Sequence, residues 1–207
     1  MKKKIIEAAK KLIIRKGFQN IKISDVAKEA KIGKGTVYLY FKHKEEIFAA
    51  LIDGFFGEAQ EFIKEAREFK GSGFDKLKRF IELDLDFYER HLDVFGTLGK
   101  DVESLGKIFG KKWMGIVMEK YLKIVKPIAS IISICKKEGT IGKIDSIEGM
   151  IVLISIIRAY VGTRIYGLNK RHLREERDKI LDIFLGGVGK RCIPKSDLVI
   201  SEGRDLG

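Results

Sequence analysis

The sequence predicts an all-α protein, with an N-terminal three-helix unit followed by a C-terminal helical bundle and about nine helices in total. Apolar residues recur with the 3.6-residue period of helices, and no stretch keeps the strict alternation of a strand. Only two prolines interrupt the 207 residues, and proline is the residue that most strongly breaks a helix. Because 45% of the residues are apolar, a chain of this length can bury a sizeable core.

The first helix is expected over residues 2–16, because its apolar side chains fall on one stripe and its lysines on the opposite face. That stripe consists of Ile5, Ala8, Ala9, Leu12 and Ile13. Gly17 is expected to end the helix. A second helix is expected over 23–30 and a third over 34–41, and the tight turn between them predicts a helix-turn-helix.

Longer helices are expected along the rest of the chain, and the Gly-Ser-Gly sequence at 71–73 ends the first of them. They are placed at 45–70, 74–90, 92–107, 111–137 with a kink or break at Pro127, 146–168 and 172–189. This reading divides the chain into an N-terminal domain at 1–47, a larger domain at 48–189 and a C-terminal tail at 190–207.

Positive charge is concentrated at the N-terminus. Residues 1–47 carry thirteen Lys and Arg against five Asp and Glu, a balance of +8, whereas the other 160 residues hold only +4 of the net charge of +12. Such a local excess attracts polyanions, because each phosphate that a lysine or arginine neutralises releases condensed counterions. The first domain is therefore expected to bind DNA, RNA or acidic lipid.

The third helix has an unusual exposed face. Val37 and Phe41 lie four residues apart and are expected to pack inward. The opposite face then carries Lys34, Gly35, Thr36, Tyr38, Leu39 and Tyr40. An exposed leucine beside two tyrosines suits the major groove of DNA, where Leu39 can touch a thymine methyl group and the hydroxyl groups can reach phosphates. Lys44, at the start of the fourth helix, can add a phosphate contact.

The stretch GFQNIKISDVAKEAKIGKGTVYLYFKHKEEIF, residues 17–48, resembles the DNA-binding signature of tetracycline-repressor-type (TetR family) transcriptional regulators. The resemblance covers about 45 residues once the first helix is included, and it implies double-stranded DNA as the partner. It also implies residue roles. Thr36, Tyr38, Tyr40 and Lys44 would contact phosphates, Lys34, Gly35 and Leu39 would face bases, and Ser24 could reach DNA from the second helix.

Two positions depart from the family pattern. Lys22 stands where a capping Thr or Ser is usual, so either Ser24 caps a later start of the helix, or the helix starts uncapped and Lys22 contributes a phosphate contact. The turn that normally reads Gly-Val-Ser is Lys31-Ile32-Gly33. Gly33 removes a side-chain cap from the third helix but leaves its N–H groups free for phosphate.

The last two helices are expected to form a homodimer interface. The segment at 146–168 is apolar on nearly every side through its middle and needs cover on two faces. The pair suits an isologous four-helix contact with a second copy, and a dimer could read a palindromic operator through two half-sites. The expected interface residues are Ile154, Ile180, Leu181, Phe184, Leu185 and Val188. The alternative is a buried core helix in a monomer.

The resemblance also implies a cavity for a small apolar or amphipathic effector. Its expected lining residues are Phe87, Trp113, Met118, Tyr121, Arg158 and Tyr160. Plain core packing is the alternative for each aromatic residue. Arg158, inside an apolar helix, needs a partner, which is either an acidic effector or an internal carboxylate. The candidate carboxylates are Glu82, Asp84 and Asp86.

Enzymatic activity is not expected. The three histidines lie apart in polar surroundings, and the sequence has no nucleophile–base pair, no metal-ligand spacing and no phosphate-binding glycine loop. No metal and no cofactor are therefore predicted. Cys135 and Cys192 are expected to stay reduced in the cytoplasm. The apolar run at 150–157 is shorter than a membrane-spanning helix requires, and the scarcity of Asn and Gln suggests a thermophilic source.

These observations predict a cytoplasmic, nucleoid-associated transcriptional regulator, most simply a repressor that an effector releases from DNA. In this reading, residues 1–47 bind DNA and residues 48–189 bind the effector and dimerise. The alternative is an effector-free architectural or cell-division protein on the same scaffold, and a C-terminal core without a cavity of about 300 Å³ would favour it.

Overall fold

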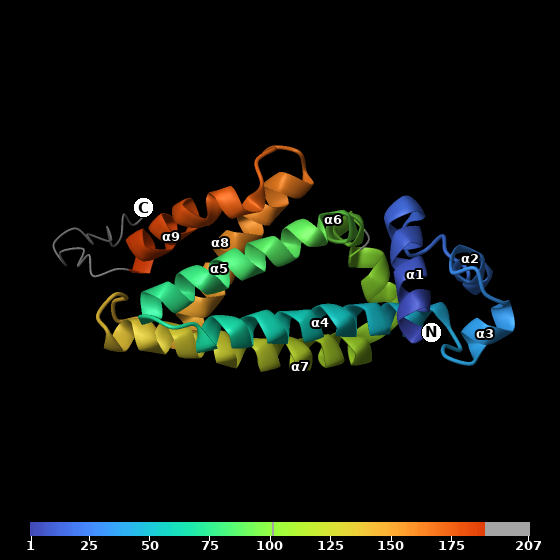
Figure 1. Cartoon of the computed structure of the whole chain (residues 1–207), viewed down its shortest axis with the longest axis horizontal. Coiled ribbons are helices and arrows are strands. Elements are labelled where there is room, and N and C mark those ends of the chain that lie inside the picture. The colour runs from blue at the N-terminus through green and yellow to red at the C-terminus, as the bar shows by residue number, and fades with distance from the viewer. Residues whose placement is uncertain (101, 189–207) are drawn as a thin grey trace, which may run out of the picture.

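The described part of the chain is entirely helical. The computed structural model describes residues 1–100 and 102–188, with the backbone alone at 100, 102–109, 111–114 and 188, so the predicted tail at 190–207 lies outside the described residues. Within these ranges it has nine α-helices, one short 3₁₀ helix and no strand. The predicted all-α fold is confirmed. Figure 1 shows three short helices at one end of an elongated bundle.

The N-terminal unit consists of α1 (Lys2–Lys16), α2 (Ile23–Glu29) and α3 (Lys34–Tyr38). All five residues of the predicted apolar stripe of α1 are buried. Helix α3 ends three residues earlier than expected. The backbone N–H groups of Tyr40 and Phe41 both donate to the Val37 carbonyl, at 3.0 and 2.9 Å, and this tight turn leads the chain toward α4.

Helix α4 (Lys44–Glu68) joins the N-terminal unit to the bundle, and it runs without interruption across the predicted division after residue 47. It is followed by α5 (Gly73–Arg90) and α6 (Leu92–Lys100). A capping box begins α5, because the Ser72 hydroxyl accepts from the Asp75 N–H at 3.2 Å and the Asp75 carboxylate accepts from the Ser72 N–H at 2.9 Å.

Helix α7 (Val102–Lys137) lies alongside α4 (Figure 1). The expected helices at 92–107 and 111–137 are divided differently: the first ends at Lys100, and the non-helical backbone inside α7 is at Gly110, with φ 66° and ψ −177°. Glycine adopts these angles without a steric penalty. The chain stays helical through Pro127, so no break occurs there.

The chain closes with α8 (Ser146–Ile165), the 3₁₀ helix η1 (Leu173–Glu176) and α9 (Arg177–Val188). Helix α8 ends before the predicted residue 168, in a turn with Gly167 at φ 72°. The last predicted helix, 172–189, is split into η1 and α9. The Nδ1 atom of His172 accepts from the Arg174 N–H at 3.3 Å and so caps η1.

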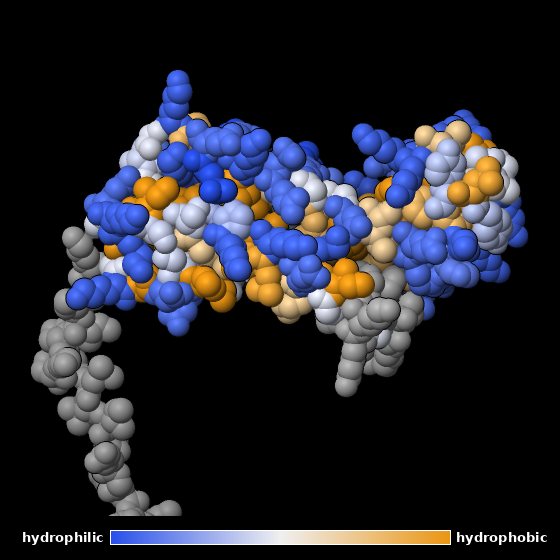
Figure 2. Space-filling model, turned by 90° about the horizontal axis from the view of Figure 1, so that it is seen from below, coloured by the Kyte–Doolittle hydropathy of each residue, from blue (hydrophilic) through white to orange (hydrophobic). Residues whose placement is uncertain are grey.

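Helix α8 is less deeply covered than its composition demands. By length and composition alone α8 could cross a membrane, although the apolar run at 150–157 was expected to be too short, and 33% of this apolar stretch is buried inside the chain. Ile147, Ile151 and Val152 of α8 are exposed, as is Ile183 of α9. The face of the molecule in Figure 2 likewise shows apolar patches between the hydrophilic residues of the body.

Candidate functional site

The exposed face of α3 is as the sequence predicted. Val37 and Phe41 are buried, whereas Leu39 is 83% exposed. Of the other residues expected on this face, Thr36 is half-buried and the rest are exposed, namely Lys34, Gly35, Tyr38 and Tyr40. A side chain added at Gly35 would meet no atom within 4 Å, so the bare backbone of α3 is accessible to a large partner.

A groove of about 480 Å³ runs beside this face, between the start of α2, helix α3 and the start of α4. Its titratable side chains, apart from a tyrosine, are four lysines, one histidine and one glutamate: Lys22, Lys34, Lys42, Lys44, His43 and Glu45. Ser24 and Tyr38 also line it. Residues predicted from three separate helices to contact DNA therefore gather at one cationic groove, which is the arrangement that phosphate binding requires.

The start of α2 resolves the first departure from the family pattern. The helix begins after Lys22, whose side chain makes no capping hydrogen bond and is exposed. Its backbone N–H donates instead to the Asp25 carboxylate at 3.1 Å, and the Lys16 ammonium donates to the same carboxylate at 2.7 Å. The hydrogen bond from Lys16, followed by that from the Lys22 backbone, lowers the pKa of Asp25. Lys22 is thus left free for an anion.

Lys44 has a structural contact that the sequence did not reveal. Its ammonium donates to the carbonyl oxygens of Phe18 and Gln19, at 3.2 and 2.8 Å, and lies 4.8 Å from the centroid of the Phe18 ring. Since an ammonium has three N–H donors, one remains for a phosphate. Lys44 therefore fixes the α1–α2 loop against α4 as well as facing the groove.

The bundle contains a cavity of about 410 Å³ between α4, α5, α6, α7 and α8. Its lining is apolar except for Asp84, Tyr88, Tyr121 and Arg158, which carry polar groups. The apolar lining residues are Ile52, Phe55, Phe56, Ala59, Phe62, Ile63, Phe80, Phe87, Phe95, Val117, Met118, Ile124, Ile128 and Ile154.

Four of the six predicted cavity residues line this cavity, namely Phe87, Met118, Tyr121 and Arg158. Tyr160 does not, because it is two positions beyond Arg158 on α8 and so faces a different side of the helix. The Trp113 side chain lies outside the described residues. Most of the lining from α4 was not predicted, although Phe55, Ala59 and Phe62 follow the spacing of one helix face.

The polar residues of the cavity form one cluster. The Arg158 guanidinium carbon lies 5.3 Å from the centroid of the Tyr121 ring, a cation–π contact. Burial raises the pKa of Asp84 to about 7, and the positive charge of Arg158 opposes this rise. Burial, followed by the Asp84 charge, raises the pKa of Tyr88 to about 12. Arg158 forms no ion pair with any carboxylate among the described residues.

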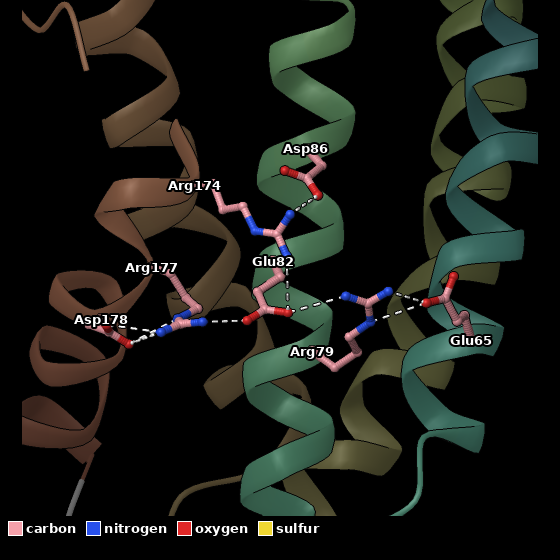
Figure 3. A network of polar contacts seen from close by, with 7 residues as sticks. All are labelled: Glu65, Arg79, Glu82, Asp86, Arg174, Arg177 and Asp178. Carbon is pink, nitrogen blue, oxygen red and sulfur yellow. Dashed lines mark hydrogen bonds and ion pairs between the residues drawn. The ribbon is translucent and has the colours of Figure 1, made fainter. Parts of the chain in front are cut away.

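Two of the three carboxylates proposed as partners of Arg158 belong to a different network, shown in Figure 3. Glu82 accepts from Arg79 at 3.2 Å and also pairs with Arg177 and Arg174, and Asp86 pairs with Arg174 at 3.5 Å. Arg79 in turn binds Glu65 at 2.5 Å. This network connects α5 with α4, η1 and α9, on the side of α5 away from the cavity.

A contact between α1 and the bundle was not predicted. The Lys10 ammonium lies 3.1 Å from His91 Nδ1, and His91 Nε2 lies 2.8 Å from a Glu58 carboxylate oxygen. The His91 ring also packs on two phenylalanines of the cavity wall, with ring centroids 4.9 Å from Phe55 and 5.0 Å from Phe87. His91 therefore touches the cavity wall and a helix of the N-terminal unit at once.

The structure places most of the predicted dimer-interface residues inside the single chain. Ile154, Ile180, Leu181 and Phe184 are buried within the chain and Leu185 is half-buried, while the Val188 side chain lies outside the described residues. The buried faces of α8 and α9 pack against α5, α7 and each other, so the single chain already covers these residues. The exposed large apolar residues of α8 and α9 are Ile147, Ile151, Val152 and Ile183.

The N-terminal residues 5–51 match the family model described as bacterial regulatory proteins, tetR family. The chain is 36% identical over 77 residues to the fatty acid metabolism regulator protein of Bacillus subtilis (strain 168), over 37% of this chain and 40% of the relative. It is 28% identical over 113 residues to the biofilm operon icaADBC HTH-type negative transcriptional regulator IcaR of Staphylococcus aureus (strain Newman), over 54% of this chain and 61% of the relative. The chain thus spans less than two thirds of the length of these relatives.

Solved structures show the same fold. The transcriptional regulator FadR from Bacillus subtilis, in complex with stearoyl-CoA, superposes with a TM-score of 0.76 at 22% identity, over 91% of this chain and 100% of that chain. The ketosteroid transcriptional regulator KstR2 of Mycobacterium tuberculosis gives a TM-score of 0.67 at 16% identity, over 92% of this chain and 95% of that chain. The relatives are regulators and not enzymes, as expected for this chain. In its N-terminal helix-turn-helix unit, residues 5–51, the chain is similar to the tetR family of bacterial regulatory proteins.

Proposed function

We propose that the protein represses transcription by binding a specific operator through α3. The observation that carries this proposal is the exposed face of α3 beside the lysine-lined groove. Leu39, at 83% exposure, would contact base edges in the major groove together with Lys34 and Gly35. Thr36, Tyr38, Tyr40 and Lys44 would hold the flanking phosphates, with Ser24 and Lys22 adding contacts from α2.

The operator in this proposal is palindromic and is read by a homodimer. Helix α3 has five residues and covers only a few base pairs, so a second copy is needed for a longer site. The exposed apolar residues of α8 and α9 provide a surface that a second copy would cover. Two symmetric copies would then present their α3 helices to successive major grooves.

The cavity supports release of the repressor by a small apolar or amphipathic effector. Its volume of about 410 Å³ falls within the range of ligand sites, and its walls are mostly apolar. Two relatives bear names that refer to fatty acid metabolism or to a bound acyl-CoA, and a fatty acyl chain fits walls of this chemistry. The same volume speaks against the effector-free architectural protein, for which a filled core was expected.

Mobility shifts on operator sites selected from random duplex DNA test the proposal. The wild-type protein is expected to enrich an inverted repeat. Leu39→Ala is expected to relax the base preference at one position of each half-site. Lys42→Gln should weaken binding uniformly across sequences and reduce the salt slope by about one.

Lys70→Gln is the control for the lysine variant. It removes the same charge from an exposed lysine just beyond the far end of α4, so it should leave both the affinity and the salt slope unchanged. Equal affinity for all duplexes, with no enriched sequence, would contradict the proposal.

A further inference from the structure

The cavity contains a buried carboxyl group without a partner. Asp84 is 8% exposed and lines the cavity. Among the described residues no hydrogen bond or ion pair reaches its carboxylate, and burial and the charge of Arg158 are what act on it. Asp84 lines the cavity, so a molecule bound there would supply the hydrogen bond that the chain itself does not give to this carboxyl group.

Arg158 shares the cavity with Asp84. Its guanidinium packs on the Tyr121 ring, and guanidinium N–H donors lie in a plane that suits a carboxylate. The other titratable groups that face Asp84 are Tyr88 on its own helix and Tyr121 on α7. Helix α4 contributes only apolar residues to the cavity, and the charged residues of η1 and α9 nearest to α5 are held by Glu82 and Asp86.

The chemistry of the missing partner follows from this set. A cationic group beside Asp84 would be repelled by Arg158. An acyl oxygen satisfies both residues, because it accepts from the guanidinium and from the O–H of a neutral Asp84. Burial favours that neutral form, since it raises the pKa of Asp84 to about 7.

We propose that Asp84 and Arg158 form the head-group site of the cavity, which takes an apolar chain that ends in an acyl group, with neutral Asp84 donating a hydrogen bond to the acyl oxygen. This inference rests on the proposed effector site, and it adds that the ligand has an acyl head group at one end of its apolar chain. The aromatic walls hold the chain, and the Asp84–Arg158 pair selects the head group.

Binding is therefore linked to a proton. Because the ligand binds the neutral form of Asp84, affinity is full below the pKa of the free protein and falls as the pH rises above it. With that pKa at about 7, the Kd for an acyl ligand is expected to be about tenfold weaker at pH 8 than at pH 6.

Calorimetric titration of the full chain with dodecanoate, dodecanoyl-CoA and dodecan-1-ol tests the proposal. Wild type is expected to bind at least one acyl probe with this pH dependence and to bind the alcohol at least tenfold more weakly. Asp84→Asn keeps an N–H donor, so it should bind the acyl probe with equal affinity at both pH values. Arg158→Met should weaken dodecanoate at least tenfold. Whether dodecanoate or dodecanoyl-CoA binds shows whether the site takes a free acid or a thioester.

Asp86→Asn is the matched control, because its carboxylate pairs with Arg174 outside the cavity, and it should retain the wild-type pH dependence. Tighter binding of the alcohol, or acyl binding that strengthens from pH 6 to 8, would overturn the proposal. Failure of both acyl probes to bind would also overturn it. Operator binding is measured without any probe and does not depend on these results. If neither acyl probe binds, the proposed DNA-binding function is therefore unaffected.

Discussion

Lys31 lies in the turn between α2 and α3 and has an uncommon backbone conformation. Its φ of 52° is the one positive φ of a non-glycine residue in the described ranges. The left-handed conformation costs an ordinary L-residue roughly 1 kcal/mol, because Cβ approaches the carbonyl oxygen. The turn is fixed nevertheless, since the Ile32 N–H donates to the Ala27 carbonyl at 3.0 Å.

Replacing Lys31 by glycine is expected to stabilise the protein. Glycine adopts positive φ without this steric penalty, so Lys31→Gly should raise the free energy of unfolding by about 0.5 to 1 kcal/mol. Chemical denaturation at equilibrium measures this change. Lys31→Ala removes the same charge but keeps Cβ, so a similar gain for alanine would show that the backbone is not the cause.

Residue patterns predicted the exposed face of α3 better than the lining of the cavity. Helical spacing placed Val37 and Phe41 inside and Leu39 outside, because one short helix packs on one core. Asp84 was left as one of three carboxylate candidates, although it stands four residues after Phe80 and three before Phe87, on the buried face of α5. That spacing was a signal for its inward position. Its lack of a partner depends on the geometry of four other helices, which no local pattern contains.

Helix α5 carries carboxylates in two different environments, one on each side of the helix. Asp84 faces the cavity without a partner, whereas Glu82 lies in the arginine network of Figure 3. Although burial acts in the opposite direction, hydrogen bonds from Arg177 and Arg79 lower the pKa of Glu82. The helix is thus held to α4, η1 and α9 on one side while its other side stays open to a ligand.

Glu82→Gln is expected to destabilise the protein by about 1 to 3 kcal/mol at neutral pH, because the arginines lose their shared carboxylate. The folded-state pKa is below the unfolded value, so the contribution of Glu82 is complete above about pH 4.3 and is lost as the pH falls further. Denaturation curves at neutral and acidic pH measure the difference between the variants. A difference that persists unchanged into strong acid would contradict this explanation.

Element boundaries were predicted where a local signal sets them. The end of α1 follows from Gly17, and the division between α4 and α5 follows from the Gly-Ser-Gly sequence at 71–73. Pro127 predicted a kink or break, and the helix is not broken there, since a helix packed on α4 and α8 can lose one backbone hydrogen bond and continue. The division of the last helix into η1 and α9 was missed because both parts have a helical period.

At the scale of the whole molecule, the exposed apolar residues of α8 and α9 are the surface through which the proposed dimer would associate. Ile151 is 49% exposed there, so a charge at this position should oppose association. Ile151→Glu is expected to sediment as a monomer under conditions in which wild type sediments as a dimer. Leu39→Glu introduces the same charge at an exposed apolar residue of α3 and should remain dimeric. An unchanged sedimentation coefficient for Ile151→Glu would place the interface elsewhere.

The N-terminal unit and the cavity meet at His91. Lys10→Met removes the contact from α1, so an acyl ligand should shift operator affinity less than in wild type, where coupling of about 1 to 3 kcal/mol is typical. Operator binding with and without dodecanoate measures the coupling. Lys11→Met removes the same charge from the adjacent exposed position and should keep wild-type coupling. A loss of coupling in both variants would assign the effect to charge alone.

The close packing between α5 and α7 hides Cys135 from reagents in solution. Its thiol is completely buried, and burial raises its pKa to about 12. A hydrogen bond from the Gly73 N–H to Glu138, at 2.7 Å, holds the start of α5 over this part of α7. A maleimide reagent can reach the sulfur only when these helices separate. The rate at which Cys135 is alkylated therefore reports how often the bundle opens.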